Sequence, residues 1–189
     1  MIHRVLQVLF VASLVGCATI PSAPPRRTIV AGPGGNTTAL LGNANYTLPP
    51  LLDLSVADSD TNAITNIELV DKATSCKTDL YLVLTGDINA HRQAAMQLEK
   101  VSLGPVRQHQ PGAISEGARQ EIAVIGAKGT QYPNTIKFPN GETIIISVND
   151  CFSQEQLIGM VWASVCKDPQ LMKKHTSRMI QLLNSRRTL

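Results

Sequence analysis

The chain is 189 residues long and carries 17 Lys and Arg against 14 Asp and Glu, a formal net charge of +3. Proteins that bind nucleic acid have concentrated basic faces, so this near balance of charge argues against nucleic acid as a partner. The length suits one domain with a hydrophobic core and an additional tether, and it is short for two domains.

The N-terminal segment has the organisation of an export signal. A positively charged start precedes the apolar run Val5–Val15. This run is much shorter than the roughly 20 residues that a transmembrane helix needs. We therefore predict that residues 1–16 are a signal peptide that is removed from the mature protein.

The end of this signal carries a motif for lipid attachment. Leu14–Cys17 (Leu-Val-Gly-Cys) resembles the lipobox of bacterial lipoproteins. The resemblance implies that Cys17 is acylated and becomes the first residue of the mature chain, so that lipid holds the protein on the membrane. Ala18 stands where lipoproteins retained at the inner membrane carry Asp, which implies the outer membrane, facing the periplasm. An ordinary secretory signal with an incidental cysteine is the alternative.

Residues 17–50 are predicted to form a disordered, flexible tether. Proline and glycine recur along them, as in Pro24-Pro25, Gly34-Gly35 and Pro49-Pro50. About 30 residues of coil have an end-to-end span near 30 Å, which suits a tether that connects a membrane to a distant partner.

The remaining cysteines, Cys76, Cys151 and Cys166, predict one disulfide, because the periplasm is oxidising. A helix predicted over residues 153–165 would hold Cys151 and Cys166 about 20 Å apart, beyond the roughly 7 Å limit for bridged Cα atoms. Cys76 is therefore predicted to be one partner. The chain has no Cys-x-x-Cys or His-x-x-x-His spacing, so no metal site is predicted.

Regular structure is predicted from residue 51 onward. Leu51–Val56 alternates like a strand, and the spacing of the apolar residues between 64 and 70 predicts one face of a helix. Asp79–Thr85 is a β-rich run that predicts a central strand covered on both faces. A helix is predicted to follow Asp87 and to end at Gly104-Pro105.

The second half of the chain predicts a hairpin followed by two helices. A strand is expected over Glu121–Ala127, and Asn140-Gly141 predicts a tight turn between strands at 136–138 and 143–148. One helix is predicted over residues 153–165, and another begins at Pro169. The apolar side of these helices either packs on the domain or docks a neighbouring subunit.

Three local sequences, and the order of elements between residues 51 and 151, resemble the OmpA-like domain, which associates with peptidoglycan. Leu80–Asp87 resembles its second strand and the turn after it, and Arg92 with Ala94-Ala95 resembles the start of its next helix. Ile122–Thr135 resembles its third strand and the exit from that strand. The resemblance implies an α+β fold, a βαβαββ two-layer sandwich over residues 51–151, with a helical extension over residues 152–189.

The same resemblance implies a binding site and a disulfide. In the family, an Asp and an Arg hold the carboxylate and the amine of diaminopimelate in the wall peptide, so Asp87 and Arg92 are the candidates for peptidoglycan binding. In the alternative interpretation, Asp87 caps the helix and Arg92 is a solvated charge. The family's second and fourth strands are antiparallel neighbours, which favours Cys76–Cys151 over Cys76–Cys166.

The sequence predicts a protein without enzyme activity and without a cofactor, because it has no Gly-x-Ser-x-Gly and no His-Glu-x-x-His. Its layout resembles small lipoproteins in the outer-membrane core of type IVB (Dot/Icm) secretion systems. This resemblance implies a structural or anchoring subunit whose partners are the membrane, other subunits of the secretion complex and peptidoglycan. A free-standing peptidoglycan-binding lipoprotein, and an inhibitor or chaperone of a periplasmic hydrolase, are the alternatives.

Overall fold

The computed structural model describes residues 27–31, 37–54, 64–84 and 86–188. The described chain contains both helices and strands, which confirms the predicted α+β class. In chain order the elements are β1 (Arg27–Ala31), β2 (Thr37–Leu41), β3 (Ala44–Leu48), β4 (Leu52–Leu54), β5 (Ile64–Asp71), β6 (Cys76–Val83), α1 (Ile88–His109), the 3-10 turn η2 (Pro111–Ala113), β7 (Ile114–Glu116), β8 (Gln120–Val124), β9 (Ala127–Lys137), β10 (Thr143–Ser153), β11 (Ile158–Cys166), α2 (Pro169–Asn184) and β12 (Arg187–Thr188).

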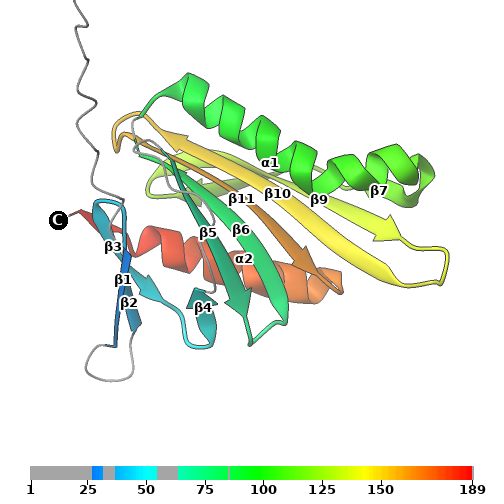
Figure 1. The fold of residues 1–189 in the computed structure, drawn as a ribbon, viewed down its shortest axis with the longest axis horizontal. Coiled ribbons are helices and arrows are strands. Elements are labelled where there is room, and N and C mark those ends of the chain that lie inside the picture. The colour runs from blue at the N-terminus through cyan, green and yellow to red at the C-terminus, as the bar shows by residue number, and fades with distance from the viewer. Residues whose placement is uncertain (1–26, 32–36, 55–63, 85, 189) are drawn as a thin grey trace, which may run out of the picture.

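The strands form two antiparallel sheets. The large sheet has the order β4-β5-β6-β11-β10-β9-β7, with β8 paired to another part of β9, and the small sheet has the order β1-β2-β3-β12. Helix α1 covers one face of the large sheet and α2 lies on the opposite face (Figure 1). Helix α2 also contacts β3, so it is packed between the large sheet and the small one.

Strand β11 is the centre of the core, because it is buried on both faces. Successive side chains of a strand point to opposite faces of its sheet. Val161 accordingly packs in the cluster that contains Leu98 of α1, whereas Trp162 packs with Met179 of α2. A strand covered on both faces needs an almost continuous apolar sequence, and this explains the composition of residues 158–166.

Two predicted helices were wrong. Residues 158–166 form β11 and residues 64–71 form β5. In β5 every second residue is buried, a period of two that the apolar spacing at 64, 67 and 70 concealed. The βαβαββ order predicted for residues 51–151 is therefore not the order that the structure has, since α1 is the one α-helix described in that range.

Several other elements were predicted correctly. Strand β6 overlaps the predicted central strand, α1 begins directly after Asp87, and β9 and β10 form the expected hairpin around Asn140-Gly141. Helix α2 begins at Pro169, with the Asp168 carboxylate accepting hydrogen bonds from the next backbone amides. Helix α1, however, continues through Pro105 to His109.

Part of the predicted tether is ordered structure. Strands β2 and β3 pair with each other, and their inward side chains are buried in the same core cluster as Trp162 and Met179. The buried set comprises Ala39, Leu41, Ala44, Tyr46 and Leu48. In β3 the apolar residues alternate with the polar Asn45 and Thr47, so the Pro- and Gly-rich composition of the surrounding chain hid a hairpin. Residues 17–26 and 32–36 lie outside the described residues.

The predicted single disulfide is present, but with the partner that was ranked second. Cys76 and Cys166 are bonded, with a Cα–Cα distance of 4.7 Å, and Cys151 is a buried free thiol. Strands β6 and β11 are antiparallel neighbours in which Lys77 faces Val165, so Cys76 and Cys166 meet at the end of that pair. Cys151 faces Met160 on β11, far along the strand from Cys166. The pairing Cys76–Cys151 was wrong because β11, not β10, lies beside β6.

Candidate functional site

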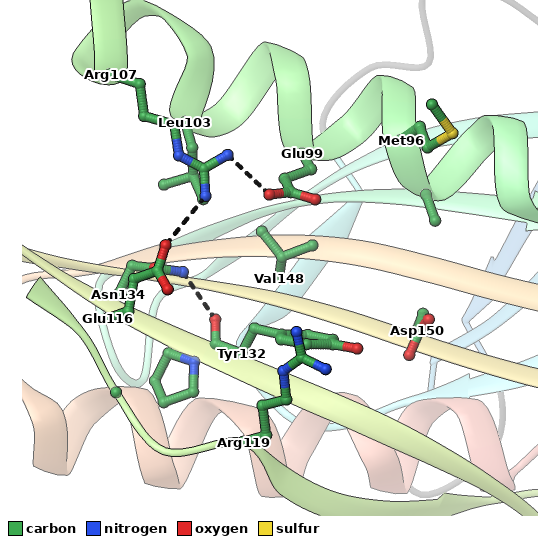
Figure 2. Close-up of a pocket in the computed structure, with 13 residues that line it drawn as sticks. Met96, Glu99, Leu103, Arg107, Glu116, Arg119, Tyr132, Asn134, Val148 and Asp150 are labelled. Carbon is green, nitrogen blue, oxygen red and sulfur yellow. Dashed lines mark hydrogen bonds and ion pairs between the residues drawn. The ribbon is translucent and has the colours of Figure 1, made fainter. Parts of the chain in front are cut away.

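The described surface is hollowed by a groove between α1 and the β7–β9–β10 side of the large sheet, with a volume of about 320 Å³ (Figure 2). The floor comes from the sheet and one wall comes from α1. The outer wall, opposite α1, comes from the last residue of β7 and the chain that follows it. The lining residues are Ala95, Met96, Glu99, Leu103 and Arg107 of α1, Glu116, Gly117 and Arg119 of the outer wall, and Tyr132, Pro133, Asn134, Val148 and Asp150 of the sheet.

One end of the groove is closed by an ion-pair bridge. The Arg107 guanidinium donates to Glu99 at 2.8 Å and to Glu116 at 3.4 Å. The hydrogen bond with Glu99, and the negative charge of both carboxylates, raise the pKa of Arg107. All three side chains are well exposed, so the bridge orients β7 against α1 more than it stabilises the fold.

The other end carries one cation and one anion, Arg119 and Asp150. The Arg119 guanidinium lies over the Tyr132 ring, 4.7 Å from its centroid. Asp150 lies on β10, on the same face as Val148, and both line the groove. Among the described residues, neither Arg119 nor Asp150 forms an ion pair. This end therefore presents a cation and an anion to the solvent.

His91 lies one helical turn before Ala95 of the groove and is buried against the sheet. Its ring packs on Gly159 and on Phe152, whose ring centroid is 5.3 Å away. Burial lowers the pKa of His91, the Arg92 charge lowers it further, and the Asp150 charge opposes both effects. Its Nδ1 atom has no hydrogen-bond partner among the described residues, so a proton gained there is not compensated by a hydrogen bond.

We expect His91 to make stability depend on pH. Its folded pKa is below the unfolded value of 6.5, so the unfolded chain binds the proton first, and the free energy of unfolding falls as the pH decreases below 6.5. Each such histidine contributes a slope of at most about 1.4 kcal/mol per pH unit. The His91→Phe variant keeps an aromatic ring on Gly159 and should lose its share of this slope, as measured by urea unfolding at pH 7.5, 6.0 and 5.0. At pH 7.5 it should be at least as stable as the wild type, and an unchanged slope would contradict the assignment.

A second set of polar side chains connects α2 to the large sheet. The His175 Nδ1 atom lies 2.9 Å from the Asp71 carboxylate, and its Nε2 atom lies 2.6 Å from the Thr78 hydroxyl. The Thr78 hydroxyl is 2.8 Å from that of Ser164, and Arg178 donates from Nε to Asp71 at 2.8 Å. An acid, a histidine and a hydroxyl in this order are the parts of a nucleophilic catalytic site.

Burial gives this network a structural role. Asp71, His175 and Ser164 have no exposed surface, and Thr78 has almost none, so a substrate has no access to the hydroxyls. Burial lowers the pKa of His175 despite the neighbouring Asp71 carboxylate. For Asp71, burial alone would raise the pKa, but the hydrogen bonds from Arg178 and His175, together with the positive charge of Arg178, outweigh it and lower the pKa. A neutral His175 that donates to an ionised Asp71 fastens α2 to β5 and β6.

The residues predicted from the sequence lie elsewhere. The Asp87 carboxylate accepts a hydrogen bond of 2.8 Å from the Asn89 amide and caps α1, as the alternative interpretation stated. Arg92 is exposed in the first turns of α1, and neither residue lines the groove. Cys17 lies outside the described residues.

The groove residues were missed because they come from four separate segments. The Asn140-Gly141 turn was a sequence signal for the floor of the groove, because it sets the strand register in which Tyr132 faces Val148. That register, together with the period of two, places Tyr132, Val148 and Asp150 on one face of the sheet. No sequence signal connected Arg119 or α1 to this face.

Neither a family model nor a curated protein matches the chain. Among solved structures it is similar to cyanobacterial PsbP from Synechocystis, at 7% identity over 93% of this chain and 99% of that chain, with a TM-score of 0.42. The Saccharomyces cerevisiae Ran-binding protein Mog1p has 10% identity over 87% and 96% of the two chains and a TM-score of 0.42. LpqN, involved in cell envelope biogenesis of Mycobacterium tuberculosis, has 14% identity over 85% and 89% and a TM-score of 0.41. Similarity at this level carries no conclusion about function.

Two further properties bear on membrane and metal binding. Within the part of the chain that the structure describes, no helix has both the length and the apolar character needed to cross a bilayer. Among the same residues, no three His, Cys, Asp or Glu side chains are grouped so that they could hold a metal ion.

Proposed function

We propose that this protein is a lipid-anchored, non-enzymatic protein of the outer membrane that faces the periplasm and serves as an anchoring subunit of an envelope-spanning secretion complex. The observation that carries the proposal is Leu14–Cys17 directly after a short apolar run. The buried disulfide Cys76–Cys166 supports it, because such bonds persist in oxidising compartments. The type IVB lipoprotein called IcmN or DotK is the one whose layout the chain resembles.

The exposed groove beside α1 supports a binding role over a catalytic one. Its charged groups come from three elements and it is open to solvent, whereas the acid, histidine and hydroxyl that could form a catalytic set are buried. A module that presents a groove on one side, and is held by lipid at its N-terminus, is suited to connect the membrane to a second component.

The test of this proposal is the Cys17→Ser variant. We expect the wild-type chain to incorporate labelled palmitate and to fractionate with the outer membrane, and the variant to lose the label and to appear in the periplasm or remain unprocessed. The Cys151→Ser variant, which leaves Leu14–Cys17 intact, is the matched control and should fractionate like the wild type. Membrane partition of Cys17→Ser equal to that of the wild type would contradict the anchor.

Purification from the native membrane in mild detergent separates the anchoring role from its alternatives. A large assembly that contains this chain supports the secretion-complex role, whereas a one-to-one soluble complex favours an inhibitor or chaperone. A peptidoglycan pull-down that Asp87→Asn and Arg92→Gln abolish would favour the free-standing wall-binding lipoprotein.

A further inference from the structure

The charged residues that line the groove fall into two groups: a satisfied set, whose members form ion pairs with one another, and an unsatisfied pair, whose members form none with the described residues. Arg107 is engaged by Glu99 and Glu116. Arg119 and Asp150, which line the same groove, have no ion-pair partner among the described residues. In Figure 2 the satisfied set lies where α1 meets β7, and the unsatisfied pair lies toward the sheet and the outer wall. One free cation and one free anion in one groove are complementary to a ligand that carries both charges.

The Arg119 side chain is held in a conformation suited to a carboxylate. The carbon of its guanidinium lies 4.7 Å from the centroid of the Tyr132 ring, a cation–π contact, and its N–H donors form no hydrogen bond or ion pair with another described residue. The planar fork of these N–H donors matches a carboxylate with two parallel hydrogen bonds. Because the ring already fixes the guanidinium, less side-chain entropy is lost on binding.

Asp150 provides the opposite charge. It is half-buried on β10, and its neighbour on the α1 side is His91, whose pKa burial lowers. A neutral His91 does not compensate the carboxylate, so Asp150 is left to attract a cation from solvent. An ammonium group is a compact donor of three hydrogen bonds and fits a single carboxylate.

The space between the two charges sets the size and character of the ligand. Leu103 and Val148 are buried at the base of the groove, while Met96 is 72% exposed at its rim. These side chains favour an aliphatic body. A volume of about 320 Å³ lies at the small end of the range for ligand sites, which suits one to three amino acid residues.

We propose that this groove binds a small zwitterionic ligand of the amino acid or short-peptide class, with its carboxylate on Arg119, its ammonium group on Asp150 and its aliphatic side chain on Val148 and Met96. The proposal does not depend on the lipid anchor: Cys17→Ser tests the anchor and leaves the groove intact, whereas the experiment below tests the groove and leaves the anchor intact.

The test uses the full chain in mild detergent and saturation-transfer NMR with leucine, Ala-Leu and Ala-Ala-Leu as probes of increasing charge separation. Each probe is compared with its N-acetylated and its C-amidated form. We expect at least one free probe to bind, and either blocking group to raise its Kd about tenfold, because each removes a charged hydrogen-bonding group.

Variants assign the two ends of the ligand. In Arg119→Gln the C-amidated probe should bind no more weakly than the free probe, and in Asp150→Asn the same should hold for the N-acetylated probe. Lys128→Gln and Glu155→Gln, which change exposed charges outside the groove, should keep the wild-type Kd. Within the part of the chain that the structure describes, neither groove side chain forms an ion pair or a side-chain hydrogen bond to α1 or the sheet, so unfolding midpoints at pH 7.5 should be unchanged.

Two results would overturn the proposal. The first is no binding of any probe by the wild type, and the second is binding that the blocking groups do not change. If no probe binds and Arg119→Gln loses affinity for phosphatidylethanolamine vesicles, the groove is assigned to a lipid headgroup instead. The comparison of blocked and free probes uses the wild type alone, so it decides the matter even if a variant fails to fold.

Discussion

Reduction of the Cys76–Cys166 disulfide should lower the free energy of unfolding by about 4 kcal/mol. The bond joins residues separated by 90 positions. In the chain-entropy model, a closed loop of that length restricts the unfolded chain strongly, with a stabilisation of about 4 to 5 kcal/mol for about 100 residues. In the folded state the bond ties the ends of β6 and β11, the two strands at the middle of the core. Urea unfolding of the wild type with and without reductant measures the difference.

The remaining thiol offers a matched control for this prediction. A double variant, Cys76→Ser with Cys166→Ser, should unfold at one urea concentration whether or not reductant is present. Cys151→Ser should stay as sensitive to reductant as the wild type, because the Cys151 thiol is free and its hydrogen bonds to the Val124 and Ala127 carbonyls can be made by a hydroxyl. Sensitivity lost in Cys151→Ser and kept in the double variant would show that the wrong pair had been assigned.

The elements that were predictable from the sequence are those with a local signal. The Asp168-Pro169 start of α2 and the Asn140-Gly141 turn each depend on the conformational preferences of two or three residues, and both occur as expected. Strand β11 could not be recognised in this way. Its residues are apolar on both faces because α1 and α2 cover both sides of the sheet, so its sequence has no period that separates strand from helix.

The wrong prediction of a helix in place of β11 also affected the predicted disulfide and the predicted site. With residues 153–165 treated as a helix, β11 was missing from the predicted sheet, and the resemblance to the OmpA-like domain then made β10 the assumed neighbour of β6 and Cys151 the favoured partner of Cys76. In the structure β11 lies between β6 and β10, which brings Cys166 to Cys76 instead. The groove could not be predicted from the sequence for the same reason. Arg119 contacts Tyr132 because β7 pairs with β9, which brings the chain after β7 beside β9. Which strands pair in a sheet depends on contacts between residues far apart in the sequence, and local sequence patterns do not predict these contacts.

Loss of the Asp71 charge should destabilise the fold by about 3 kcal/mol or more. The carboxylate is fully buried and accepts hydrogen bonds from Arg178 and His175, and removal of one member of a buried ion pair leaves an uncompensated charge that costs about 3 to 5 kcal/mol. Asp71→Asn keeps the shape of the side chain and removes its charge. Urea unfolding at pH 7.5 gives the difference from the wild type.

Asp53→Asn is the matched control, and a pH series gives the decisive second measurement. Asp53 lies on β4 beside the residue that faces Asp71, but its ion pair with Lys72 is exposed, so its loss should change the free energy of unfolding by less than about 1 kcal/mol. The pKa of Asp71 is below its ordinary value of 3.8. The stabilisation from its charge is therefore fully present above pH 3.8 and is lost as the pH falls through the folded pKa. The gap between Asp71→Asn and the wild type should accordingly hold between pH 7.5 and 4.5 and close at lower pH. If Asp71→Asn and Asp53→Asn have equally small effects, Asp71 does not carry a buried charge that fastens α2 to the sheet.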